Sequence, residues 1–336
     1  MYLSKRSNGI YYIYFFQPNG KRTCISTKSS NKSEALKFLS KFEAQLKVRL
    51  ESKLNPISLK QFIFEFLKYS ESIHSINHTK SLKTTFNCFF NYTGNLLLSE
   101  IKKEIIVSFI EKRLREVTSY TVKRDIADLS SAFSYAISKK FLSENLCKGI
   151  RKPKIIEKLP LYFSEVEFET LLRAIDDNDL KDLVIFAVNT GLRQSDLINL
   201  EWKQISFMNR YLILDNRNSL TKSRKVHTIP LNIKSLQILN DRQLKKKDSD
   251  KIFTYHNKPI KQLFISHKFK KYVYLSGLNP KLSFHCLRHT FGSWLVQRGV
   301  SIYQVSKLLT HSDLRITQIY SHLRVEDLKE AVEKLN

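Results

Sequence analysis

The stretch from His285 to Tyr320 constrains this chain more than any other, because residues able to handle a phosphodiester recur in it at short spacings. His285 and Arg288 stand about one helical turn apart, on the same face of a helix. Arginine offers a planar fork of donors to two phosphate oxygens, and histidine donates a hydrogen bond or a proton. His311 and Tyr320 follow, separated by nine positions (320 − 311 = 9) with a short helical pattern between them. The stretch predicts a site that aims a phenol at a bound phosphate.

Four motifs in the second half of the chain resemble those of the tyrosine recombinases, the phage integrase and Xer family. They are TGLRQSDL at 190–197, Thr221-Lys222-Ser223, HCLRHTF at 285–291 and LLTHSDLRITQIYSHL at 308–323. Their order and separations are those of the family, over residues 157–336. The resemblance implies six catalytic residues, which are Arg193, Lys222, His285, Arg288, His311 and Tyr320.

The resemblance also implies a mechanism without metal, ATP or organic cofactor. Tyr320 would attack the phosphorus and form a 3′-phosphotyrosine bond, and Arg193, Arg288 and His311 would stabilise the added negative charge. Lys222 lies in a polar turn, 215–225, between two predicted strands, and would protonate the departing 5′-oxygen. Its neighbours Arg224 and Lys225 are rivals for this role. A phenol is mostly protonated at neutral pH, so a base must help, and His285 is the best-placed candidate in the sequence.

Other catalytic classes fit the sequence poorly. His285 and His289 have the i, i+4 spacing of zinc ligands, but the position of the HExxH glutamate holds Cys286. A cation beside Arg288 would also be repelled. The chain has neither a GxSxG elbow nor a GxxxxGK[ST] loop, which argues against a serine hydrolase and a P-loop NTPase.

Composition points to a polyanionic partner. The 57 Lys and Arg residues outnumber the 31 Asp and Glu residues, leaving a net charge of +26. A charge of this size attracts nucleic acid over long range, although a ribosome-bound protein would also be basic. The scattered cysteines suit a reducing cytosol, and no signal or membrane-spanning run is evident. We expect a cytoplasmic, nucleoid-associated protein without a membrane partner.

Residues 1–52 form the first predicted domain. They hold ten Lys or Arg and three Asp or Glu residues. The segments 10–16 and 21–26 predict strands around a turn at 18–20, and a helix begins near Asn31. This sheet-plus-helix unit resembles the arm-type DNA-binding domain of phage integrases, although a basic hairpin that only packs on its neighbour has the same pattern.

Residues 56–150 form the second predicted domain, which is helical. Three apolar stripes recur at helical spacing, beginning at Leu59, Ile101 and Ile126. Phe86, Phe89 and Phe90 are predicted as core rather than as base-stacking side chains. The region resembles the SAM-like core-binding domain of the family, and the basic segment 145–159 is predicted as the interdomain linker.

Residues 157–336 form the predicted α+β catalytic domain. Ser164 and Glu167 predict a capping box, Gly191 a helix end, and segments 211–214 and 226–230 two strands. The chain is thus expected to be multidomain and mainly α with small β-sheets. Thr310 departs from the family, in which glycine usually precedes the histidine, and so restricts the turn that presents His311. The segment 324–335 has the pattern of an amphipathic helix, although a helix that packs on its own domain has the same pattern. The resemblance implies that it docks on a neighbouring protomer, and so implies a tetramer on DNA.

Three functions compete. The first is a site-specific recombinase that integrates or excises a mobile element at specific double-stranded DNA sites, with DNA-bending accessory proteins as further partners. The second is relaxation of DNA in the manner of a type IB topoisomerase, which shares the chemistry. The third is a catalytically silent, DNA-binding regulator, against which the presence of all six candidate residues argues.

Overall fold

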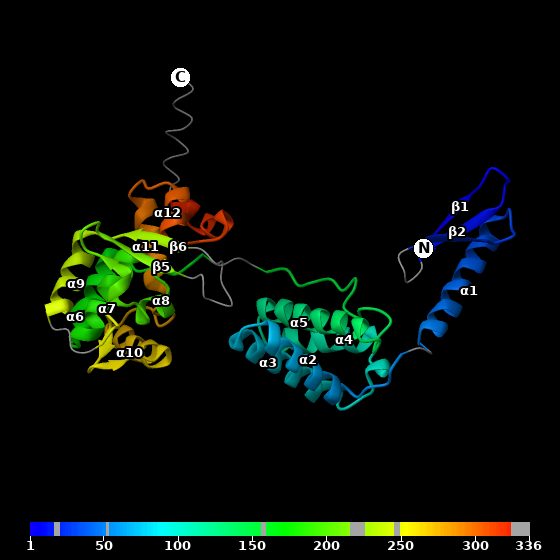
Figure 1. The fold of residues 1–336 in the computed structure, drawn as a ribbon, viewed down its shortest axis with the longest axis horizontal. Coiled ribbons are helices and arrows are strands. Elements are labelled where there is room, and N and C mark those ends of the chain that lie inside the picture. Colours follow the sequence, from blue (N-terminus) through cyan, green and yellow to red (C-terminus); the bar gives the residue numbers. More distant parts are fainter. Residues whose placement is uncertain (17–20, 52–53, 156–158, 216–225, 245–248, 324–336) are drawn as a thin grey trace, which may run out of the picture. The chain divides into compact units, whose positions relative to one another are not determined.

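The computed structural model describes residues 1–336 except 17–20, 52–53, 156–158, 216–225, 245–248 and 324–336 (Figure 1). The chain divides into two compact units, residues 1–156 and 157–336. Helices dominate both units, and each contains a small antiparallel sheet. The predicted fold class, mainly α with small β-sheets, is confirmed.

The chain begins with a three-stranded antiparallel sheet followed by one long helix. The elements are β1 (Tyr2–Lys5), β2 (Tyr11–Phe16), β3 (Arg22–Ser26) and α1 (Lys32–Glu51). Ile13 is fully buried under α1, and the rings of Phe15 and Phe42 join sheet and helix at 5.3 Å. The two predicted strands and the helix are present, while β1 was not anticipated. The predicted turn at 18–20 lies outside the described residues.

Four helices and one 3₁₀ turn follow. They are α2 (Leu59–Ile73), α3 (Ile76–Thr93), η1 (Leu98–Glu100), α4 (Lys103–Glu116) and α5 (Ser119–Ser138). Ser58, Ser75 and Thr118 cap three of the helices by accepting hydrogen bonds from backbone N–H groups. The interior is aromatic: Phe86 and Phe89 are buried, and Phe90 packs against them. The prediction that these rings belong to the core is confirmed.

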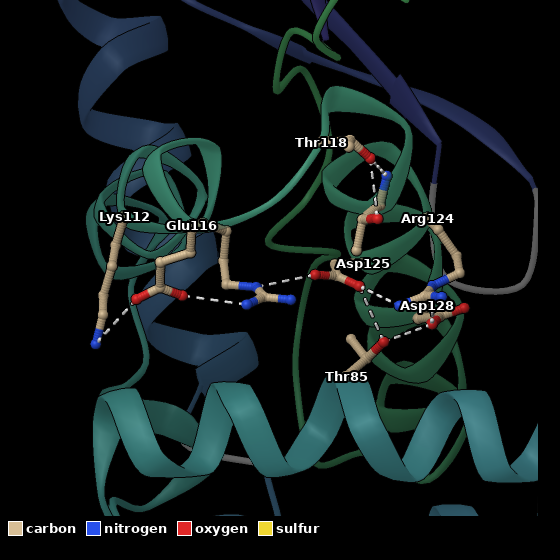
Figure 2. Close-up of polar contacts among 9 residues, drawn as sticks. Thr85, Lys112, Glu116, Thr118, Arg124, Asp125 and Asp128 are labelled. Atoms are coloured by element: carbon tan, nitrogen blue, oxygen red, sulfur yellow. Dashed lines mark hydrogen bonds and ion pairs between the residues drawn. The ribbon is translucent and has the colours of Figure 1, made fainter. Parts of the chain in front are cut away.

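A buried polar network joins three of these helices (Figure 2). Asp125 of α5 accepts hydrogen bonds from Arg113 Nε at 3.1 Å, Arg124 Nη2 at 3.1 Å and Thr85 Oγ1 at 3.2 Å. Thr85 lies 2.8 Å from Asp128 as well. Each carboxylate therefore has a cation or a hydroxyl beside it, which is the condition under which buried charges are tolerated.

The second unit holds the remaining elements, packed around α7. They are α6 (Glu165–Ala174), α7 (Asn178–Thr190), α8 (Gln194–Ile198), η2 (Trp202–Gln204), β4 (Ile205–Ser206), β5 (Tyr211–Asp215), β6 (Val226–Pro230), α9 (Ile233–Leu244), β7 (Thr254–Tyr255), β8 (Lys258–Pro259), α10 (Gln262–Leu275), α11 (Cys286–Gln297), α12 (Ile302–Leu308), η3 (Leu314–Ile316) and η4 (Gln318–Leu323). Strands β4, β5 and β6 form one antiparallel sheet, and β7 and β8 a hairpin.

Local sequence signals account for two helix ends in this unit. Ser164 and Glu167 form the predicted capping box of α6, and Gly191 ends α7 as predicted. Helix α10 begins at Gln262, shortly after the β7–β8 hairpin. His256 and Asn257 both have positive φ, which suits the tight turn of the β7–β8 hairpin and delays the helix.

Helix α11 is held in the middle of the second unit by contacts at both ends. It packs against α7, α12 and η4, and Figure 1 shows α12 next to it. Thr290 Oγ1 accepts a hydrogen bond from Phe163 N at 2.9 Å, and Trp294 Nε1 donates to Phe163 O at 3.0 Å. These bonds fix the rotation of α11 and so determine which face it turns toward the site.

Candidate active site

The corner between α7 and α8 places Arg193. Gly191 has a φ of +62°, the left-handed conformation that ends many helices. A Cβ atom there would lie 2.4 Å from Phe291 Cδ1, so the contact with α11 also requires glycine. Arg193 is the N-cap residue of α8 and follows the corner directly. Arg193 therefore lies at the positive N-terminal end of this short helix.

Arg288 is the most deeply buried cation of this region, with 5% of its surface exposed. Its Nη1 donates to Gly191 O at 2.7 Å, and its Nη2 donates to Leu309 O. Burial and the charge of Arg193 lower the pKa of Arg288 to about 10, which leaves it protonated at neutral pH. Two backbone carbonyls therefore orient a permanent charge without neutralising it.

The turn after α12 contacts both arginines. Leu309 accepts from Arg288, and Thr310 Oγ1 accepts from Arg193 Nη1 at 3.0 Å. Thr310 has a φ of +52°, a region that β-branched residues rarely occupy. The expectation that threonine strains this turn agrees with the geometry, and the hydroxyl contributes a contact that glycine could not make.

His311 follows this turn and is braced from the next 3₁₀ segment. Its Nδ1 lies 2.8 Å from Oγ1 of the fully buried Thr317. Burial, together with the charges of Arg288 and Arg193, lowers the pKa of His311 to about 4. The ring is therefore neutral at physiological pH and carries one N–H donor.

Tyr320 lies in η4 with 1% of its surface exposed. Its ring passes over Gly292 of α11, where a Cβ atom would come within 3.0 Å of Cε2 and Cζ. Its hydroxyl forms a 2.8 Å hydrogen bond with His289 Nδ1. Burial raises the pKa of Tyr320 to about 12, so the phenol is protonated until a ligand or a base changes its surroundings.

His289 was not among the predicted site residues. It stands one helical turn after His285, and the two rings meet edge to face with centroids 4.9 Å apart. Burial and the neighbouring charges of His285 and Arg288 lower the pKa of His289 to about 4. The i, i+4 spacing from His285 was visible in the sequence, but it was weighed only as a metal motif.

The structure brings five of the six predicted site residues together. Arg288 and Arg193 both bond to the turn that precedes His311. The rings of His285 and Tyr320 both contact His289, which follows Arg288. Lys222 lies outside the described residues.

In the described part of the chain, no group of three or more His, Cys, Asp or Glu residues is arranged to hold a metal. No described helix is both long and apolar enough to cross a membrane.

Comparison with known proteins identifies the family of the chain. Residues 162–327 match the model of the phage integrase family. A tyrosine recombinase of Thermosipho africanus is 29% identical over 273 residues, which cover 78% of this chain and 94% of that protein. Tyrosine recombinase XerC of Pediococcus pentosaceus is 28% identical, covering 74% of this chain and 87% of the relative.

Solved structures share the fold. A lambda integrase dimer bound to a COC′ core site superposes with a TM-score of 0.69 at 20% identity, covering 95% of this chain and 93% of that one. The Tn1549 transposon integrase in complex with a circular intermediate DNA gives a TM-score of 0.70 at 18% identity, covering 83% and 100%. Family model, relatives and fold agree, and the chain belongs to the tyrosine recombinase family of site-specific recombinases.

Proposed function

We propose that this protein cleaves and rejoins DNA strands at specific sites through a 3′-phosphotyrosine intermediate, with Tyr320 as the nucleophile. The observation that carries the proposal is that the Tyr320 hydroxyl bonds to His289 on α11, next to Arg288, while the turn at Leu309 and Thr310 binds both arginines. The two arginines are like charges held close together. Such an arrangement is unfavourable in the free protein and becomes favourable when a phosphate enters.

Arg193 and Arg288 would stabilise the transition state. A phosphodiester under attack gains negative charge on its nonbridging oxygens, and Arg193 and Arg288 provide donors that are always charged. His311 adds a neutral donor if its Nδ1 accepts from the Thr317 hydroxyl, because the proton then resides on Nε2. Preorganised donors of this kind typically contribute about 3–4 kcal/mol each.

The proposed reaction balances without an added cofactor. The bond between Tyr320 Oη and phosphorus forms while the bond from phosphorus to the 5′-oxygen breaks. A histidine, which the sequence suggests is His285, takes the phenol proton, and Lys222 gives a proton to the 5′-oxygen. A 5′-hydroxyl from another strand then attacks the phosphotyrosine and releases Tyr320. The energy of the phosphodiester is conserved, so the strand is rejoined.

We further infer assembly on double-stranded DNA as a homotetramer. Lambda integrase has been solved as a dimer on a core site and as a tetramer on a Holliday junction. The segment 324–335, which lies outside the described residues, has the apolar spacing of a docking helix. The second unit carries a depression that we propose as the docking site, and its apolar lining includes Phe168, Leu172, Ile185, Leu236, Trp294 and Leu295.

The proposed setting is integration or excision of a mobile element in the cytoplasmic nucleoid, with DNA-bending accessory proteins as further partners. The chain shares its fold with lambda integrase and with the Tn1549 transposon integrase, and the name of the second refers to a mobile element. A net charge of +26 supports a nucleic-acid partner.

A covalent-trapping assay tests the reaction. Purified protein is mixed with nicked duplexes from the DNA that flanks its own gene, and the products are separated on denaturing gels. We expect a slow-migrating adduct with the wild type and none with Tyr320→Phe. Specific binding without an adduct would instead indicate a silent regulator.

A second assay separates recombination from topoisomerase activity. Two copies of the bound site are placed on one plasmid, and a plasmid without sites serves as control. Strand exchange between the sites supports a recombinase. Relaxation of both plasmids at equal rates, with no exchange, would contradict it and favour the topoisomerase alternative.

A further inference from the structure

We propose that His289, rather than His285, receives the proton of Tyr320 as the bond to phosphorus forms. This inference rests on the proposed function, because it assigns the base of the same reaction. It concerns a residue that the motif comparison left without a role, since His289 directly follows Arg288 in HCLRHTF.

The geometry of Tyr320 favours His289. The Nδ1 atom of His289 lies 2.8 Å from Oη, within the 2.6–3.2 Å reach expected of a general base. Both groups come from well-packed positions: His289 faces Tyr320 from α11, and Gly292, one turn later, leaves space for the phenol ring. The packing of η4 on α11 thus brings the two groups together.

His285 is less suitably placed. It occupies the N-cap position of α11, one turn before His289, and its ring meets the edge of the His289 ring at 89°. In the described part of the chain, the hydrogen bond of Tyr320 Oη is made to His289. His285 is therefore next in line behind His289, where it can pass a proton onward or contact the phosphate.

The protonation state of His289 agrees with this role. Burial first, then His285 and Arg288, depress its pKa, so the ring is neutral and its Nδ1 can accept. The charged or titratable groups around it are His285 and Arg288 on α11, His311 after α12 and Tyr320 itself. A bound phosphate offsets the arginine charges and makes the imidazole more basic at the moment when the proton must move.

The proton balance is simple. As Oη bonds to phosphorus, its proton passes to Nδ1 of His289, and the ring becomes an imidazolium beside the new phosphotyrosine. The 5′-oxygen leaves with a proton from Lys222. When a 5′-hydroxyl attacks in the rejoining step, the imidazolium returns its proton to the departing Tyr320.

Two matched variants test the assignment. Asparagine places a side-chain oxygen near the position of Nδ1, so His289→Asn can keep the hydrogen bond to Tyr320 but cannot take its proton. We expect single-turnover cleavage of a nicked duplex to fall about 100-fold in His289→Asn, with unchanged DNA binding and melting temperature. His285→Asn should fall less. The same change at the exposed His267 on α10 is the control and should leave cleavage unchanged.

A sulfur-substituted substrate identifies which proton transfer is lost. A thiolate leaving group at the 5′ position needs no proton, so it should restore cleavage by Lys222→Ala. It should not restore cleavage by His289→Asn, because attack still requires removal of the phenol proton. Rescue of both variants would overturn the proposal.

The pH profile supplies a third reading. Wild-type cleavage should fall as pH drops below the pKa of His289 in the DNA complex, and this fall should be absent in His289→Asn. If His289→Asn cleaves at the wild-type rate, the proposal is wrong even though the wild-type adduct supports the proposed function. If the wild type forms no adduct, the proposed function itself fails.

Discussion

Each of the two units buries a cluster of charged residues. The two clusters differ in whether opposite charges within the cluster compensate one another. In the first unit, residues 1–156, Arg113 and Asp125 pair directly and are joined by Thr85 and Asp128 (Figure 2). In the second unit, residues 157–336, Arg288 and Arg193 lie near each other. Their hydrogen bonds go to backbone carbonyls and to a threonine hydroxyl. One cluster is balanced by its own residues, while the other remains strongly positive.

We infer from this difference that the two clusters have different roles. A buried pair of opposite charges is locally neutral, and its value lies in fixing the packing of α3, α4 and α5. Positive charge is costly in the second cluster, because burial first and neighbouring positive charges second lower the pKa values of Arg288, His289 and His311. That cost is recovered only when an anion binds. We therefore expect disruption of the first cluster to affect stability and disruption of the second to affect catalysis.

The largest effect is expected from Arg288→Lys. Lysine keeps the charge but cannot donate to Gly191 O and Leu309 O while facing a phosphate. We predict a loss of about 10²–10³-fold in single-turnover cleavage, measured as adduct formation on a nicked duplex. Arg298→Lys, the same change at the end of the same helix, is the control and should retain cleavage. Equal activity of Arg288→Lys and wild type would contradict the assigned role.

The next largest effect is expected from Arg113→Leu, on stability. Removal of the arginine leaves Asp125 buried without its main partner, which typically costs about 3–5 kcal/mol. Hydrogen exchange of the α3 and α5 amides should accelerate, while those of α7 and α11 should not. The double variant Arg113→Leu with Asp125→Leu should recover much of the protection, since no unpaired charge remains. Uniform acceleration in both units would show that the network is not local.

Acidification should change the contributions of the two clusters to the stability of the fold in opposite directions. His289 and His311 have a pKa of about 4 in the folded protein, below the value near 6.5 expected when unfolded. As pH falls from about 6.5 to about 4, the unfolded state takes up protons that the folded state refuses, so these histidines destabilise the fold. Burial raises the pKa of Asp128, so acidification acts in the opposite direction there.

Thermal melting across this pH range measures the effect. We predict that His289→Asn with His311→Asn flattens the fall in melting temperature between pH 6.5 and pH 4. A bound duplex should also reduce the fall, because its phosphate favours the protonated rings. An unchanged slope in the double variant would place the acid sensitivity elsewhere.

The smallest effect is expected from Thr310→Gly. Left-handed backbone costs a non-glycine residue roughly 1–2 kcal/mol, so glycine relieves strain. It also removes the hydroxyl that accepts from Arg193. We predict a slightly raised melting temperature and a cleavage rate about threefold lower. Thr310→Ser keeps the hydroxyl and should keep the rate, and a Thr310→Ser rate as low as that of Thr310→Gly would exclude this contact as the cause.

Much of the fold could be predicted because its signals are local. The capping box at Ser164 and the helix end at Gly191 are short patterns with a direct physical cause, and both are present. The strand β1 and the hairpin of β7 and β8 were missed, because two- to four-residue strands carry little periodicity. They are stabilised by their pairing partners, which single-segment patterns do not reveal.

Some residues of the candidate site could be predicted from the sequence, and others required the fold. Residues within named motifs, such as Arg193 and His311, could be selected from the sequence. The contact of His289 with Tyr320 could not, since it joins residues 31 positions apart and depends on the packing of η4 over Gly292. The hydroxyl of Thr310 appeared in the sequence only as a departure from glycine, and its bond to Arg193 required the fold.

The most direct test of the account is to locate the covalent bond. The adduct trapped on a nicked duplex is digested with trypsin, and the peptide that carries the nucleotide is sequenced by mass spectrometry. We predict the peptide ITQIYSHLR, residues 316–324, linked from Tyr320 to a 3′-phosphate. Linkage through another of the 15 tyrosines, or to a 5′-phosphate, would contradict the assignment of this cluster as the catalytic centre.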